Sequence, residues 1–185
     1  EDTTGAITFS LDDKFIFYSK LDQNHRPRKI FRHKIGDTVK NDELIFEEKS
    51  EAFSVGLSLS SDEKYFFINT SDHNTSEQYY FECNEEKPKP KLIKKRKKGI
   101  IYSINSWNGY FYNHTNENAE DFKIDICEDL LNQNWKPYIP AREEVLIGGL
   151  TFLKNWILRG EVSNALGKIF VKNIETNIEE EIQFT

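Results

Sequence analysis

Short apolar runs recur along this chain with a nearly constant spacing. The first run of each repeat begins at Ala6, Phe53, Ile100 or Leu146, so that successive repeats start 47, 47 and 46 residues apart. Three more runs follow within each repeat, and they are rich in the aromatic and β-branched residues that favour strands. The second runs cover 15–18, 65–68, 110–112 and 156–158, the third 29–33, 78–83, 122–127 and 168–172, and the fourth 44–46, 92–93, 137–139 and 181–184.

Each repeat therefore predicts one small sheet of four strands. Such a sheet cannot bury both of its faces alone, and repeated sheets of this size stack on one another as the blades of a β-propeller. We expect an all-β fold with about four four-stranded blades, at approximately 6–48, 52–96, 99–140 and 144–185. No segment predicts a helix, because residues 119–129 alternate between polar and apolar side chains instead of following a helical period.

Turn residues separate the first and second runs of the repeats. The segments 10–14 and 61–64 carry Ser and Asp, whose side chains bind turn amides. Asn108-Gly109 occupies the same place in the third repeat and predicts a two-residue hairpin, since both residues tolerate positive φ. Lys154-Asn155 is a weaker turn signal in the fourth repeat.

Composition limits the cellular setting and the class of partner. Cys83 and Cys127 form no CxxC pair, and the chain shows neither a signal peptide nor a stretch long enough to span a membrane. We expect a reduced cytoplasmic protein with no membrane partner, and we expect both cysteines to be free. The formal net charge of -6 argues against a general binder of polyanions.

The segment from Lys87 to Lys98 departs from this acidic background, with eight cations in twelve residues. Nucleic-acid binding would use such charge, but this run offers only Leu92 and Ile93 as apolar residues and no aromatic platform. We interpret the run as an outer strand edge that lysines protect against pairing, which Pro88 and Pro90 also favour.

The chain lacks the residues of a hydrolytic site. A serine hydrolase of the α/β type places its nucleophile in a G-x-S-x-G elbow, and the segment Gly56–Ser60 has no second glycine and reads as an alternating strand. The four histidines lie in different repeats, without the close pairing of metal ligands. We therefore expect no catalytic residue, no metal and no cofactor.

Many segments, in their order along nearly the whole chain, resemble oligopeptidase B, a group within the prolyl-oligopeptidase family of serine peptidases. They include a Phe/Tyr strand, an Arg-Pro loop, an Arg-His strand that ends in Gly, and a Thr-Ser-Glu strand start. Two positions depart from the pattern, since Gly148 replaces an acidic residue and Glu161-Val162 a Glu-Arg pair. The matching residues are 17–18, Asp22, 26–27, 32–33, Gly36, 46–48, Phe53, 60–61, 75–77, Tyr102, 111–112, 115–116, Phe122, Trp135, 139–140 and 142–143.

The resemblance implies part of a seven-bladed propeller whose catalytic α/β-hydrolase domain is absent from this chain. In that family the propeller gates the access of small peptides to the hydrolase domain, and the whole enzyme cleaves after Arg or Lys. The hydrolase domain and small peptides are then the partners. Arg142 and Glu143 are the candidates for contact with that domain or for gating.

A second interpretation is a free-standing propeller that serves as a protein or peptide interaction module. Four blades could then close on themselves. If the chain is instead part of a seven-bladed propeller, four blades of seven leave uncovered apolar faces, which we expect on the first repeat, with Phe15 and Phe17, and on the fourth, with Trp156 and Ile157. These faces predict self-association.

Overall fold

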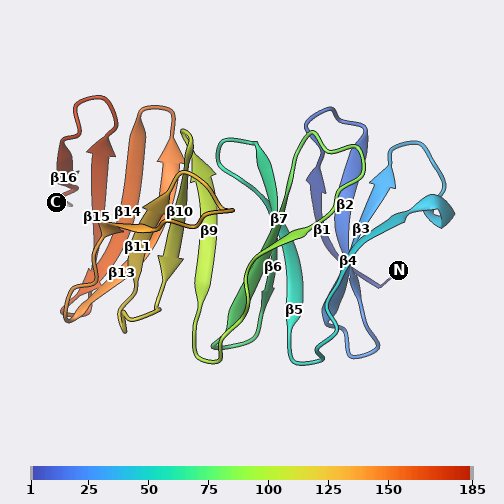
Figure 1. Ribbon diagram of the computed structural model, residues 1–185, viewed down its shortest axis with the longest axis horizontal. Coiled ribbons are helices and arrows are strands. Elements are labelled where there is room, and N and C mark those ends of the chain that lie inside the picture. Colours follow the sequence, from blue (N-terminus) through green and yellow to red (C-terminus); the bar gives the residue numbers. More distant parts are fainter. Residues whose placement is uncertain (1, 184–185) are drawn as a thin grey trace. The chain divides into compact units, whose positions relative to one another are not determined.

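The structure is a computed structural model that describes residues 2–183, and it contains sixteen strands in four antiparallel sheets (Figure 1). Within each sheet the strands lie in sequence order from one edge to the other. The first sheet consists of β1 (Thr3–Phe9), β2 (Phe15–Leu21), β3 (Pro27–Lys34) and β4 (Glu43–Glu47), and the second of β5 (Ser54–Leu59), β6 (Tyr65–Ser71), β7 (Ser76–Glu82) and β8 (Lys91–Lys94). The third consists of β9 (Tyr102–Trp107), β10 (Tyr110–Thr115), β11 (Lys123–Cys127) and β12 (Lys136–Ile139), and the fourth of β13 (Val145–Leu153), β14 (Trp156–Ser163), β15 (Leu166–Asn173) and β16 (Glu179–Glu181).

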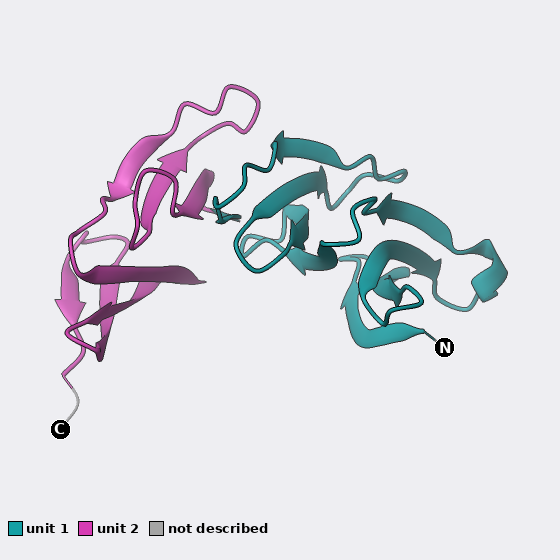
Figure 2. Ribbon diagram, turned by 90° about the horizontal axis from the view of Figure 1, so that it is seen from below, with its two compact units in different colours: residues 1–106 teal, residues 107–185 magenta. Residues whose placement is uncertain are grey.

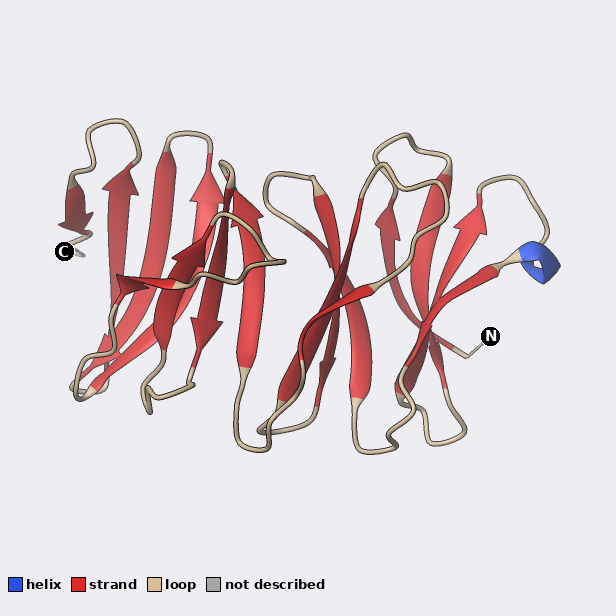
Figure 3. Cartoon of the chain, viewed as in Figure 1, coloured by secondary structure: helices blue, strands red, loops and turns tan. Residues whose placement is uncertain are grey.

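The expected all-β fold of four four-stranded blades is confirmed. Each apolar run of the sequence overlaps one strand, and the last residue of the final run, Phe184, lies outside the described residues. The one helical element in the described part of the chain is a short 3-10 helix, η1 (Val39–Asn41), between β3 and β4 (Figure 3). No helix among residues 2–183 is long and apolar enough to cross a membrane.

The chain divides into two compact units, residues 1–106 and 107–185 (Figure 2). The first unit holds the first two sheets together with most of β9, and the second unit holds β10 to β16.

The Ser-Asp turns form as the sequence predicts. In the first sheet the Ser10 hydroxyl donates to Asp12 Oδ1 at 2.7 Å and accepts from the amide of Phe15 at 2.9 Å. Ser60 and Asp62 repeat the hydroxyl–carboxylate contact in the second sheet, also at 2.7 Å. One side chain thus satisfies turn amides that the strands leave free, which fixes the register of the hairpin.

Two hairpins rest on pairs of residues with positive φ. Asn108 and Gly109, between β9 and β10, have φ values of 50° and 82°, as the Asn-Gly signal predicts. Asn164 and Ala165 form a second such pair between β14 and β15, with φ values of 52° and 60°. The sequence did not reveal this pair, because alanine is unfavourable in the left-handed region.

Aromatic rings fill the core of the first unit. The ring of Phe17 lies 4.8 Å from that of Phe66 and 5.8 Å from that of Phe81, measured between centroids. Phe17 is therefore only 3% exposed, and the expectation that it lies on an uncovered face was wrong. The same holds for Ile157 in the second unit, which is 7% exposed because it packs in the core with Ile147 and Tyr112.

Side chains of β7 bind the backbone of β9 inside the first unit. Ser76 Oγ donates to the carbonyl of Tyr102 and accepts from its amide, both at 2.7 Å. Gln78 Oε1 accepts from the backbone amide of Ile104 at 2.7 Å, and the backbone amide of Gln78 donates to the Tyr102 hydroxyl at 2.9 Å. Polar side chains thus take the place of a strand ladder between these two strands.

Candidate functional site

Arg142 lies in the turn that leads into β13, where the amide of Val145 donates to its carbonyl at 3.3 Å. The guanidinium of Arg142 binds the carboxylate of Glu161 on β14, and 44% of the Arg142 side chain remains exposed. Glu143 is exposed in the same turn and makes no ion pair within the described residues. The two candidates are thus neighbours in sequence but not partners.

A chain of alternating charges continues from Arg142 across the fourth sheet. Glu161 Oε1 accepts from Arg159 Nε at 2.7 Å, and the other two nitrogens of Arg159 bind the two carboxylate oxygens of Glu179 at 2.7 and 2.9 Å. Residues 159 and 161 can share a carboxylate contact because alternate residues of a strand point to the same face. Two cations and two anions therefore neutralise one another.

The two central members of this chain of charges are buried. The side chains of Glu161 and Arg159 are only 2% and 7% exposed. Burial lowers the pKa of Arg159, but hydrogen bonds to Glu179 and Glu161 more than offset this effect and raise it. Hydrogen bonds from Arg159 in turn hold the pKa of Glu179 below its ordinary value. The sequence analysis named Arg142 and Glu161 but missed Arg159 and Glu179. The only signal for these two residues was the alternation of side chains between the two faces of their strands.

A second charge cluster corrects the interpretation of the basic run. β8 is indeed an outer strand, at the edge of the second sheet. Arg96, however, turns inward, where its Nη2 lies 2.6 Å from Glu48 Oε2 and 2.7 Å from Glu77 Oε2. Its guanidinium also lies 4.0 Å from the ring centroid of Phe53. One of the eight cations, Arg96, thus connects β7 with the segment that follows β4, and it does not protect a strand edge.

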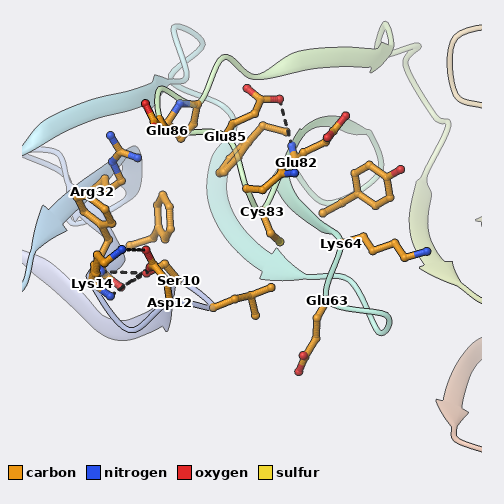
Figure 4. A pocket seen from close by; sticks show the side chains of 17 residues that line it. Ser10, Asp12, Lys14, Arg32, Glu63, Lys64, Glu82, Cys83, Glu85 and Glu86 are labelled. Atoms are coloured by element: carbon orange, nitrogen blue, oxygen red, sulfur yellow. Dashed lines mark hydrogen bonds and ion pairs between the residues drawn. The ribbon is translucent and has the colours of Figure 1, made fainter.

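A groove of about 930 Å³ opens between the first and second sheets, inside the first unit (Figure 4). One side is the Ser10–Lys14 turn with the ends of β2 and β3, and the other is the β5–β6 turn with the segment that follows β7. Its volume lies within the range of small-ligand pockets. Its apolar lining residues are Leu11, Phe15, Phe17, Tyr65, Phe81 and Pro88, and most of the other residues that line it are polar or charged.

The thiols are poor nucleophiles. Both cysteines are free, and Cys83 is half-buried in the wall of the groove while Cys127 is buried in the second unit. Burial raises the pKa of Cys83 to about 12 and that of Cys127 to about 11, so both are neutral thiols at physiological pH.

Ser58 lies on β5, a strand, as the sequence indicates, and its hydroxyl accepts from the Asn69 amide at 3.1 Å. His33 pairs with Asp42 at 2.6 Å, and His114 Nε2 lies 2.7 Å from the carbonyl of Ile147. No group of three metal-binding side chains is present in the described part of the chain.

The family model for the prolyl oligopeptidase N-terminal beta-propeller domain matches residues 1–184. "Protease 2" from Moraxella lacunata is 31% identical over 157 residues, which cover 78% of this chain and 23% of that protein. "Prolyl endopeptidase-like" from Homo sapiens is 30% identical over 147 residues, which cover 78% of this chain and 20% of that protein. The chain therefore spans between a fifth and a quarter of the length of these relatives.

Solved structures agree in fold. Oligopeptidase B from Trypanosoma brucei, in a closed form with covalently bound antipain, matches with a TM-score of 0.91 at 20% identity, over 100% of this chain and 28% of that chain. Oligopeptidase B from Leishmania major matches with a TM-score of 0.90 at 19% identity, over 100% of this chain and 27% of that chain. The family match over residues 1–184 places this chain in the prolyl oligopeptidase N-terminal beta-propeller domain family, as a propeller portion like that of oligopeptidase B.

Proposed function

We propose that this chain is the non-catalytic propeller portion of an oligopeptidase B-like serine peptidase, and that it gates the access of small peptides to an α/β-hydrolase domain outside this chain. The observation that carries the proposal is the family match over residues 1–184. The chain's own chemistry supports it, since both thiols are neutral and Ser58 lies on a strand with an amide as its partner. On this proposal the four blades cover approximately residues 6–48, 52–96, 99–140 and 144–185. The whole enzyme works in the cytoplasm.

Gating of this kind is steric. Stacked blades leave a narrow opening that an extended peptide can pass and a folded protein cannot. The propeller then selects by size, while the choice of Arg or Lys at the cleaved bond belongs to the hydrolase domain. The free-standing interaction module remains the alternative outcome of the test below.

Arg142 is the residue of this chain that we propose to face the hydrolase domain or the opening, together with Glu143. Its guanidinium is anchored to Glu161, which fixes its direction, and its exposed surface leaves room for a further partner. Glu143 is exposed beside it, and its carboxylate forms no ion pair within residues 2–183. An anchored cation next to a free anion suits a polar contact between domains.

The test is to tag the gene that encodes this chain at its own locus and to purify the product. We expect a polypeptide longer than 185 residues that cleaves an arginyl or lysyl amide substrate. A folded protein with exposed lysines should resist cleavage until it is unfolded. The purified 185-residue chain alone should show no turnover, because it has no activated nucleophile.

Two results would overturn the proposal. A native product no longer than this chain and without peptidase activity would favour the interaction module. Cleavage of folded proteins at the rate of unfolded ones would show that the propeller does not select substrates by size.

A further inference from the structure

The groove between the first two sheets has an aromatic floor that neighbouring strands hold in place. Phe17 and Phe81 are buried at its base, while Phe15 and Tyr65 are only partly covered. The floor is thus preformed by core residues and does not depend on mobile side chains. An apolar side chain of a ligand would find contact there.

Arg32 supplies a donor without a partner in the wall of this groove. Its residue is only 6% exposed, yet its Nε has no hydrogen-bond partner among the described residues. Its Nη2 donates to Glu43 at 2.6 Å, and its guanidinium lies 4.4 Å from the ring centroid of Phe15, which fix its position. A buried donor of this kind costs free energy until it finds an acceptor. Because the Nε atom is itself covered, a carbonyl oxygen in the groove reaches it only when the side chains above it move aside.

Carboxylates without cations lie along the segment that follows β7. Glu82 and Glu86 line the groove, are exposed, and form no ion pair within residues 2–183 (Figure 4). Two other carboxylates of the lining are already paired, Asp12 with Lys14 at 3.0 Å and Glu85 with Lys91 at 3.7 Å. Among the exposed lining residues on this side that form no ion pair within residues 2–183, Glu63, Glu82 and Glu86 outnumber Lys64, so the unpaired charge is negative on balance, which repels free anions and attracts cations.

We propose that this groove binds an extended peptide segment in which an apolar residue is flanked by lysine or arginine. The apolar side chain lies on the Phe15 and Tyr65 rings, a backbone carbonyl accepts from Arg32, and the basic side chains reach Glu82 and Glu86. A lipid or a free carboxylate would satisfy Arg32 but not the acidic side, and a bare polycation would leave Arg32 and the floor without a partner. The groove lies wholly within residues 1–106, so the inference does not depend on the proposed gating.

The experiment measures binding of a fluorescent capped peptide, acetyl-Lys-Arg-Leu-Lys-Arg-amide with a dye, to the 185-residue chain by anisotropy. We expect saturable binding that weakens with salt, and a matched peptide with Glu in place of each basic residue should not bind. The double variant Glu82→Gln/Glu86→Gln should raise Kd by roughly tenfold, because it removes two charge pairs at the surface. Both residues are exposed, so the variant should fold normally.

The matched control changes the net charge equally at a distance from the groove. Glu120 and Glu175 are exposed in the second unit, and Glu120→Gln/Glu175→Gln should leave Kd within twofold of the unsubstituted chain. Arg32→Lys keeps the charge but loses the fixed Nε donor, and it should weaken binding while the salt dependence stays the same.

Cys83 provides an independent reporter of location. In a Cys127→Ser background, the peptide should slow the reaction of Cys83 with N-ethylmaleimide by at least fivefold at saturation. The neutral thiol reacts slowly, which allows the rate to be followed over hours. Absence of saturable binding, equal loss in the control double variant, equal binding of the acidic peptide, or an unchanged Cys83 rate at saturation would each overturn the proposal.

Discussion

Ala165 adopts a backbone conformation that is unfavourable for alanine. It has a φ of 60° in the two-residue loop between β14 and β15, where left-handed backbone costs a residue with a Cβ about 1 kcal/mol. Ala165→Gly should therefore raise the free energy of unfolding by up to about 1 kcal/mol. Urea denaturation, followed by circular dichroism, measures the change through the midpoint at constant m-value.

Ala52→Gly is the control for this prediction. Ala52 is exposed in a turn, and its φ is not positive. The same substitution should lower stability there, because glycine only adds freedom to the unfolded chain. Equal effects at the two positions would show that backbone strain is not the cause.

Gly148 is a residue whose neighbour leaves no room for a side chain. A Cβ at this position would lie 2.6 Å from the carbonyl oxygen of Gly160, where the β13–β14 register shifts between Ile147 and Leu150. The backbone therefore has no room for a side chain at the position where the family pattern has an acidic residue. Gly148→Ala should lower the free energy of unfolding by about 2 kcal/mol, as overpacking does elsewhere.

Gly149→Ala is the matched test at the adjacent position, where a Cβ would meet nothing within 4 Å and φ is not positive. It should change stability by less than about 0.5 kcal/mol. Thermal or urea unfolding of the two variants side by side compares their free energies of unfolding. If Gly148→Ala were as stable as Gly149→Ala, the close approach would not limit this position.

At the scale of strands and sheets, the sequence predicted all sixteen strands because period-2 apolar runs and Ser-Asp or Asn-Gly turns are local signals. It did not predict the partners of charged side chains. Arg96 binds Glu48 from a distant segment, and Arg159 binds Glu179 from the next strand but one. Such partners depend on which strands of one sheet, or of two neighbouring sheets, come together, which no local pattern records. The groove was missed for the same reason, because Arg32 and Glu86 come from different sheets.

Arg96 joins two sheets, and its removal should show a distinct pH dependence. Burial by itself raises the pKa of Glu77, but hydrogen bonds from Arg96 more than offset this effect, so the pKa lies below its ordinary value of 4.5. A carboxyl of this kind stabilises the fold above its unfolded pKa, and this contribution disappears as the pH falls through its folded pKa. Arg96→Gln should therefore lower stability at pH 7 by about 2 kcal/mol, less than for a fully buried pair.

The difference between Arg96→Gln and the unsubstituted chain should shrink as the pH falls below 4.5. Lys95→Gln, at an exposed neighbour, removes the same charge and should have little effect at any pH. Urea midpoints between pH 3.5 and 7 give the comparison. A loss of stability that is constant over this range would show that the ion pairs with Glu77 and Glu48 do not cause it.

The remaining cations after β8 should act on solubility. Lys95, Lys97 and Lys98 are exposed, and changing all three to Gln should raise aggregation without lowering the unfolding midpoint. Turbidity at high protein concentration measures the first effect. Salt-sensitive binding of nucleic acid that is present in the unsubstituted chain and lost in this variant would instead identify the run as a binding surface.

At the scale of the whole molecule, apolar side chains remain uncovered in each of the two units. Ile7 and Phe9 on β1 are 52% and 51% exposed in the first unit, and Leu153 and Trp156 are 48% and 43% exposed in the second. Propeller blades bury such surface against neighbouring blades. The sequence had placed Trp156 on an uncovered face, whereas Ile7, Phe9 and Leu153 take the place of Phe17 and Ile157.

The uncovered residues predict that the 185-residue chain associates with itself in solution. Covering the exposed half of a large apolar side chain contributes about 1 kcal/mol, so Phe9→Ser/Trp156→Ser should weaken association roughly thirtyfold. Light scattering across a dilution series should show a mean mass above that of one chain, which the double variant lowers. Leu131→Ser is the control, because Leu131 is 81% exposed outside the strands and should contribute little. A mass that stays at one chain at high concentration would contradict self-association through these residues, and it would favour the free-standing interaction module over the peptidase portion.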